Sequence, residues 1–140
     1  MNIWWIREDV AGLDDERMFD QQFDISIPVH LIGEIIAKIS NELQDCEGVK
    51  TIFPFGHVAD GNIHFIIGKD SDSEELKSQI NDIIYNNTEL VNGSISAEHG
   101  IGLDKKRYLI KSRSEDEISL MRLLKKTIDP KNILNPGRVF

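Results

Sequence analysis

The chain has 140 residues, a formal net charge of −8 at pH 7 and a single cysteine. Its length fits one domain with one hydrophobic core, and its acidic balance argues against binding to nucleic acid or to an anionic membrane. No apolar run approaches the ~20 residues of a membrane span, and no internal disulfide can form. We therefore expect a protein without a membrane span in a reducing compartment, the cytoplasm.

The spacing of apolar residues predicts the order strand, helix, strand, strand, helix, strand. Residues 23–29, 49–56, 62–68 and 93–97 are typical of strands, whereas 31–43 and 76–90 carry apolar side chains at helical spacing. This order indicates an α+β fold, a ferredoxin-like split βαβ antiparallel sheet with both helices on one face.

Polar residues mark the beginnings of two helices. Ser71 and Glu74 predict a capping box for the second helix, and Ser114 with Glu117 predicts another before a helix that ends at Asp129-Pro130. The later helix adds a C-terminal helical extension to the fold.

The stretch 55–65 predicts a hairpin that brings two histidines together. Asp60-Gly61 lies between β-rich segments and is typical of a two-residue type I′ turn. In this register His57 lies directly opposite His64, with Cβ atoms roughly 4.5–5.5 Å apart. The two imidazoles could ligate one metal ion, although such a pair taken alone is more often a packed or exposed cross-strand pair.

Strand direction makes Glu98 a third candidate ligand. The fourth predicted strand starts near the Asp-Gly turn and runs parallel to the third, so Glu98 and His64 lie at similar depth. Two histidines and one carboxylate are typical of catalytic Zn²⁺, Mn²⁺ or Fe²⁺ sites. A solvated surface carboxylate is the simpler alternative for Glu98.

The next residue, His99, is a candidate general base if the strand ends at Glu98. Imidazole titrates near neutral pH, and a neighbouring metal ion would hold a substrate hydroxyl ready for deprotonation. A core or surface histidine is the alternative. His30 begins a helix without other candidate ligands nearby, and we assign it no role.

Three segments resemble signatures of the C-terminal domain of FAD-linked oxidases. Residues 56–64 are similar to G-H-x-G-D-G-N-x-H, residues 96–102 to S-x-E-H-G-I-G, and residues 129–137 to D-P-x-x-I-L-N-P-G. The family includes D-lactate dehydrogenases, the glycolate oxidase flavoprotein subunit and D-2-hydroxyglutarate dehydrogenase. These enzymes oxidise 2-hydroxy acids by hydride transfer to flavin.

The resemblance implies a role for each matching residue. It makes His57, His64 and Glu98 metal ligands and His99 the acceptor of the substrate hydroxyl proton. The substrate-binding residues would be Arg7, which suits a carboxylate, and Asn62, whereas Asn135 would lie towards the flavin. The implied cofactors are FAD, bound mainly by a domain outside this chain, and a divalent metal, Zn²⁺ or Mn²⁺.

The sequence departs from the family pattern at three positions. Gln22 replaces the lysine of a K-Y-D-x-S-x-P motif, Ala11 stands where some members have threonine, and Ala59 replaces a glycine. The first two changes put the anchoring of the substrate in question.

We expect three parts in the chain. Residues 1–22 would be an N-terminal segment left from a longer substrate domain, residues 23–98 the ferredoxin-like unit with the metal site, and residues 99–140 the C-terminal helices and tail towards the FAD-binding domain. Two tryptophans near the start, Trp4 and Trp5, also suggest a piece of a longer protein.

Three functions compete. The leading hypothesis is the C-terminal portion of an FAD-dependent D-2-hydroxy-acid oxidoreductase, inactive as the 140-residue chain alone. The expected partners are a small 2-hydroxy acid and the FAD-binding domain, and a homodimer is left open. The alternative is a non-catalytic metal-binding or subunit-association module. An RNA-binding ferredoxin-like domain is disfavoured by the acidic charge.

Overall fold

The computed structural model describes residues 19–140, at the centre of which is a three-stranded antiparallel sheet. Its strands, in the spatial order β1-β3-β2, are β1 (Phe19–Ser26), β3 (Asn62–Lys69) and β2 (Val49–His57). β1 begins earlier than the alternation of residues predicted. Arg7 and Ala11, and most of the predicted N-terminal segment, lie outside the described residues.

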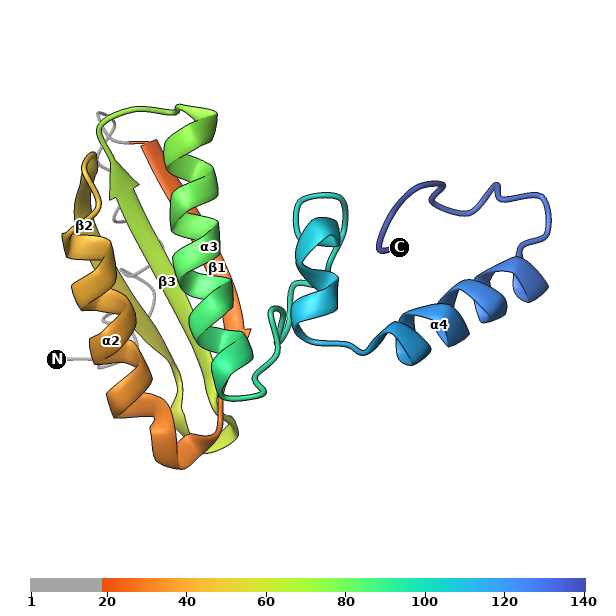
Figure 1. Cartoon of the computed structure of the whole chain (residues 1–140), viewed down its shortest axis with the longest axis horizontal. Coiled ribbons are helices and arrows are strands. Elements are labelled where there is room, and N and C mark those ends of the chain that lie inside the picture. The colour runs from red at the N-terminus through yellow and green to blue at the C-terminus, as the bar shows by residue number, and fades with distance from the viewer. Residues whose placement is uncertain (1–18) are drawn as a thin grey trace, which may run out of the picture.

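Two helices cover one face of this sheet. Helices α2 (Ile32–Gln44) and α3 (Glu74–Leu90) lie side by side on that face, as Figure 1 shows. A single hydrophobic core fills the space between the layers, because apolar side chains on one side of the strands meet the apolar stripes of both helices. The α+β class and the placement of both helices on one face are confirmed.

The cap of α3 differs from the prediction. Ser73, rather than Ser71, is the N-cap, and its side chain accepts a hydrogen bond from the backbone N–H of Leu76 at 3.2 Å. The preceding residue, Asp72, pairs with Lys69 and Lys77. The helix therefore starts at Glu74, and Lys77 in its first turn reaches back to the Asp72 carboxylate.

The predicted fourth strand is reduced to one antiparallel bridge between Ser26 and Ser94. The two residues exchange backbone hydrogen bonds of 2.9 and 2.8 Å. Further along, the N–H of Ile95 donates to the Ser112 hydroxyl, and the N–H groups of residues 97–99 donate to a carboxylate on β1. Side chains therefore accept hydrogen bonds from the backbone N–H groups that a fourth strand would need for pairing with β1.

The turn between β2 and β3 is longer than the predicted two residues. Residues Val58–Asp60 form a 3-10 turn, and Gly61 follows in the left-handed region. As a result His57 pairs with Asn62, and His64 pairs with Phe55, so His57 is not directly opposite His64. Because the displacement is two residues, both histidines still share a face of the sheet.

The C-terminal part is helical, as predicted. A 3-10 helix (Lys106–Lys111) precedes α4 (Glu115–Ile128), which begins with the predicted capping box of Ser114 and Glu117. Figure 1 shows α4 extending away from the sheet. Within α4 only Ile118 is buried, and Ile128 is 75% exposed. No helix within residues 19–140 is long and apolar enough to cross a membrane.

Candidate metal and substrate site

The candidate site lies on the face of the sheet opposite α2 and α3. Along β3, Ile63 and Phe65 are buried in the core, so the alternating Asn62 and His64 point to the other face. Asp24 of β1 pairs directly with His64. β1 and β3 thus align polar side chains at one end of the face opposite α2 and α3.

Three aromatic rings surround His64. The Phe55 ring stacks on it at a centroid distance of 5.1 Å, and the His99 ring lies 5.5 Å away. The His57 ring stands nearly perpendicular to it at 6.4 Å. His64 is therefore the central imidazole of the group, within reach of both other histidines.

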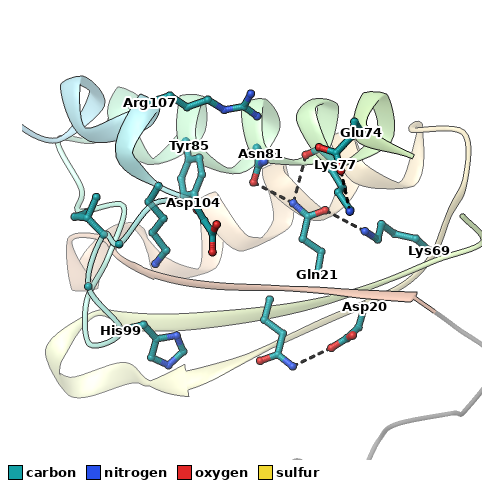
Figure 2. Close-up of a pocket in the computed structure, with 15 residues that line it drawn as sticks. Asp20, Gln21, Lys69, Glu74, Lys77, Asn81, Tyr85, His99, Asp104 and Arg107 are labelled. Carbon is teal, nitrogen blue, oxygen red and sulfur yellow. Dashed lines mark hydrogen bonds and ion pairs between the residues drawn. The ribbon is translucent and has the colours of Figure 1, made fainter. Parts of the chain in front are cut away.

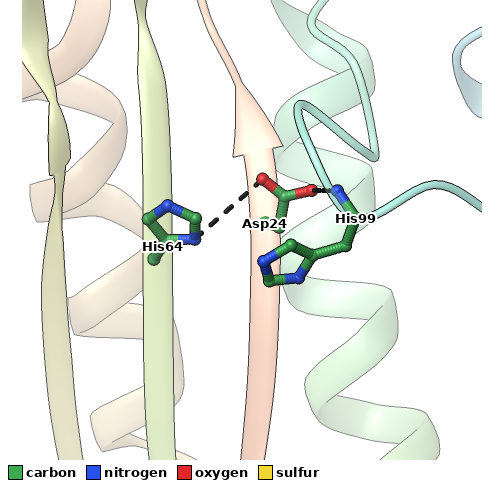
Figure 3. A group of neighbouring side chains, drawn as sticks. All are labelled: Asp24, His64 and His99. Carbon is green, nitrogen blue, oxygen red and sulfur yellow. Dashed lines mark hydrogen bonds and ion pairs between the residues drawn. The ribbon is translucent and has the colours of Figure 1, made fainter. Parts of the chain in front are cut away.

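Asp24 holds the loop that carries Glu98 and His99. Its Oδ2 atom accepts hydrogen bonds from three successive backbone N–H groups, those of Ala97 at 3.0 Å, Glu98 at 2.9 Å and His99 at 2.8 Å. Figure 3 shows the carboxylate between the His64 ring and the His99 backbone. We call this arrangement of Asp24 and the N–H groups of residues 97–99 the carboxylate cradle.

In the described part of the chain, the groups that stabilise the charge of the buried Asp24 gather at its Oδ2 atom. Burial raises the pKa of its carboxyl, but the backbone hydrogen bonds from His99 and Glu98, with the nearby Lys105 charge, outweigh burial and lower the pKa below 3.8. The Lys105 Nζ atom lies 3.8 Å from Oδ2. Among the residues described, Oδ1 has no hydrogen-bond partner, and its neighbour is His64 Nδ1 at 3.9 Å.

Glu98 is drawn towards β2 and β3. Its Oε1 atom lies 3.4 Å from His57 Nδ1 and accepts a hydrogen bond from the Asn62 side chain. The side chains of His57 and Glu98 are each 51% exposed, whereas Asn62 is buried. This exposure leaves His57 and Glu98 open to an ion or a small molecule.

Sequence reasoning and structure agree on which segments meet here. The structure brings together five of the residues singled out from the sequence: His57, Asn62, His64, Glu98 and His99. Asn135 belongs to the tail after α4, and Figure 1 shows this tail apart from the strands. Arg7 lies outside the described residues.

Two sets of ligands that share His64 could hold a metal. One is the predicted set of His57, His64 and Glu98, in which His57 Nδ1 lies 3.4 Å from Glu98 Oε1 and the His57 and His64 ring centroids lie 6.4 Å apart. The other is Asp24, His64 and His99, the group whose ligand atoms all lie within 4.8 Å of one another. Asp24 already receives the N–H groups of the cradle and the charge of Lys105. The predicted set of His57, His64 and Glu98 stays a prediction, and its His57 and Glu98 side chains are each 51% exposed.

Sequence reasoning missed the residues that build the cradle, Asp24, Ser96 and Lys105. The Ser96 hydroxyl donates to Asp24 Oδ2 at 3.1 Å, and the Lys105 ammonium lies 3.2 Å from the same hydroxyl. A signal was present, because Asp24 is the acidic residue of the K-Y-D-x-S-x-P-like motif and lies between the apolar Phe23 and Ile25.

A polar pocket of about 740 Å³ extends from His99 along β1. Figure 2 shows His99 and Lys69 at opposite ends of it, with the α3 residues Asn81 and Tyr85 between them. Gln22, which replaces the lysine of the family motif, also lines it. The pocket has four Lys and Arg residues against three Asp and Glu residues: Lys69, Lys77, Lys105, Arg107, Asp20, Glu74 and Asp104.

The fold and this cluster define an α+β domain with histidines and carboxylates gathered on the face of its sheet opposite α2 and α3. The chain belongs to the family described as FAD linked oxidases, C-terminal domain, which matches residues 1–139.

Curated relatives are identical to the chain at about a third of the aligned positions. The chain is 36% identical over 138 residues to a mitochondrial D-2-hydroxyglutarate dehydrogenase of Danio rerio, and 36% identical over 148 residues to a D-2-hydroxyglutarate dehydrogenase of Stutzerimonas stutzeri. Each match covers 99% of this chain but only 26% and 31% of the respective relative. The chain therefore spans roughly a quarter to a third of these relatives.

Proposed function

We propose that this chain is the C-terminal portion of an FAD-dependent oxidoreductase that oxidises a D-2-hydroxy acid of the lactate, glycolate or 2-hydroxyglutarate type. The observation that carries the proposal is the meeting of Glu98 with His57 and Asn62, beside His64 and His99, in a chain that the family matches over residues 1–139. The names of the relatives favour 2-hydroxyglutarate within this class.

His57, His64 and Glu98 would hold a divalent metal, Zn²⁺ or Mn²⁺. Two imidazoles and one carboxylate leave coordination positions open for a substrate, as catalytic sites require. The buried Asn62 Oδ1 atom, which has no hydrogen-bond partner among the described residues, offers a further polar contact beside this set. When bound, the metal would polarise the substrate hydroxyl and carboxylate, and FAD would accept the hydride.

His99 would take the proton of the substrate hydroxyl on an imidazole nitrogen. Its backbone is fixed by the hydrogen bond to Asp24, and its side chain lines the pocket along β1. A general base held in this way needs only a substrate within hydrogen-bond distance. Arg7 would orient the substrate carboxylate through a bidentate contact, and Asn62 would contact the substrate next to the metal.

The partners follow from the size of the relatives. An FAD-binding domain would come from outside these 140 residues, and Asn135 in the tail would lie towards its flavin. A homodimer and a cytoplasmic location stay predictions. The two relatives named above differ in their printed location, since only the Danio rerio protein is named mitochondrial.

The metal is tested on the purified chain. After chelation and dialysis, titration with Zn²⁺ or Mn²⁺ followed by metal analysis is expected to give one bound ion per chain. His57→Ala, His64→Ala and Glu98→Gln should weaken binding by at least about 10–100-fold, since each removes a ligand. His30→Ala is the matched control, because His30 lies outside the cluster. Equal and negligible metal in wild type and variants would count against the site.

The reaction is tested by joining the chain to the FAD-binding part of the Stutzerimonas stutzeri relative in place of that protein's own C-terminal segment. Dye-linked oxidation is expected with at least one of D-2-hydroxyglutarate, D-lactate and glycolate. His99→Gln should lower kcat by about 10²–10⁴-fold while the metal stays bound, because it removes the base. Metal binding without turnover on any of the acids would favour the alternative, a non-catalytic metal-binding or subunit-association module.

A further inference from the structure

We propose that Asp24 is a positioning residue that sets the tautomer of His64 and thereby directs one nitrogen of that imidazole to the metal. The inference rests on the metal site of the proposed function and adds a residue that no site prediction included. It assigns different tasks to the two oxygens of one buried carboxylate.

The Oδ2 atom of Asp24 accepts all its hydrogen bonds from the loop at residues 96–99. It accepts from the N–H groups of Ala97, Glu98 and His99 and from the Ser96 hydroxyl, all within 3.1 Å. Every one of these groups is a donor at this oxygen, so only an acceptor fits there. The cradle therefore takes up one oxygen of the carboxylate, and the other oxygen faces His64.

The Oδ1 atom is left for His64. Asp24 is 0% exposed, and a buried carboxylate oxygen without a hydrogen bond costs free energy. His64 Nδ1 lies 3.9 Å away, and a closing movement of about 1 Å brings the two atoms within hydrogen-bond distance. Since a carboxylate oxygen can only accept, His64 must carry its proton on Nδ1.

This tautomer leaves Nε2 of His64 as the nitrogen with a free lone pair. Neutral imidazole has one N–H donor and one acceptor nitrogen, so a proton on Nδ1 makes Nε2 the metal ligand. Carboxylates that accept from the second nitrogen of a ligating histidine orient the ring and raise its basicity. Asp24 thus links the loop that supplies Glu98 and His99 to the strand that supplies His64.

Asp24→Asn is a sharp test because it keeps the shape of the side chain. The amide oxygen must occupy the cradle, since an NH₂ group there would face only donors. The NH₂ group then faces His64 Nδ1, which has to become an acceptor, and the proton moves to Nε2. We expect long-range ¹H–¹⁵N NMR of the metal-free chain to show the Nδ1–H tautomer of His64 in the wild type and the Nε2–H tautomer in Asp24→Asn.

The same variant is expected to bind Zn²⁺ about 10–100-fold more weakly in a chelator competition, the usual loss for such an outer partner. Ser96→Ala is the matched control, because it removes one donor to Oδ2 and leaves Oδ1 untouched. It should keep the wild-type tautomer and a Zn²⁺ affinity within about threefold, given the modest net effect of one hydrogen bond.

A wild-type chain with the Nε2–H tautomer would overturn the proposal, whether or not Asp24→Asn folds. An Asp24→Asn chain that folds, keeps the Nδ1–H tautomer and binds Zn²⁺ like the wild type would also overturn it. Lower thermal stability alone, with an unchanged tautomer, would assign Asp24 a purely structural role and contradict the inference. A wild-type Nδ1–H tautomer in a chain that binds no metal would support the role of Asp24 and reject only the metal of the proposed function.

Discussion

Gly61 shows how one residue determines where the site side chains lie. It ends the turn between β2 and β3 with φ 76°, and its carbonyl oxygen accepts the Ile27 N–H at 3.0 Å. A Cβ atom at this position would lie 2.2 Å from the Ile27 carbonyl oxygen. Only glycine meets both conditions, and Asn62, the partner of Glu98, comes next in the chain.

Gly61→Ala is expected to lower the free energy of unfolding by about 1–3 kcal/mol, since alanine would be strained in the left-handed region and would displace Ile27. Gly33→Ala in α2 is the matched control. A Cβ at Gly33 meets no atom within 4 Å, and alanine there should raise the free energy of unfolding by up to about 1 kcal/mol. Denaturant unfolding measures both values, and equal stabilities would contradict the turn described here.

The histidines and Glu98 could be found from the sequence because the chemistry of each is local to a short motif. Asp24 was missed although it belongs to the K-Y-D-x-S-x-P-like motif, because the backbone groups that it accepts are 73 to 75 residues away. In a strand such as 19–26 an aspartate is ordinarily one of the polar residues that alternate with apolar ones. Its burial becomes apparent only when the loop at residues 97–99 lies over it.

Among the elements, both helices and three strands follow from periodicity, but two connections do not. The Asp-Gly pair located the turn, yet the register depends on the contact of Gly61 with Ile27, which lies far away in the sequence. The strand expected at residues 93–97 has suitable residues, but its backbone donors bind side chains instead. Hydrogen bonds between residues distant in sequence therefore set the register of the hairpin and prevent the fourth strand from forming.

The end of α4 is joined to the tail by one carboxylate. Asp129 accepts the backbone N–H groups of Ile133 at 3.0 Å and Leu134 at 2.9 Å, and it pairs with Lys125 one helical turn earlier. The hydrogen bond from Lys125, followed by that from Leu134, lowers the pKa of Asp129 below its ordinary value of 3.8. The ionised form is therefore the one that holds the tail against the helix.

The contact between the end of α4 and the tail should weaken in acid. Because the folded pKa of Asp129 is depressed, its contribution to stability is present above the unfolded pKa and is lost as pH falls through the folded value. Thermal unfolding of wild type and Asp129→Asn, from about pH 7 down to about pH 3, is expected to show a gap in Tm that narrows below about pH 4. A gap that stays constant down to the lowest pH would contradict this role.

The molecule divides into a well-packed part, the sheet with α2 and α3, and a more exposed part, α4 with the tail. The core lies between the sheet and α2 and α3, whereas α4 leaves Leu120, Leu123 and Leu124 more than half exposed. The helical spacing of its apolar residues makes α4 amphipathic. This spacing could not show which surface meets the apolar side, since periodicity carries no information about a partner.

The carboxylate cradle also determines when the site forms during folding. The hairpin of β2 and β3 closes a short turn, but the hydrogen bonds of Asp24 close loops of 73 to 75 residues, which carry a higher entropic cost. Pulse-labelled hydrogen exchange should therefore show the amides of residues 97–99 gaining protection after those of β3. Simultaneous protection would contradict this order. In the expected order, the sheet forms before the loop at residues 97–99 is in place, so the proposed metal site is assembled last.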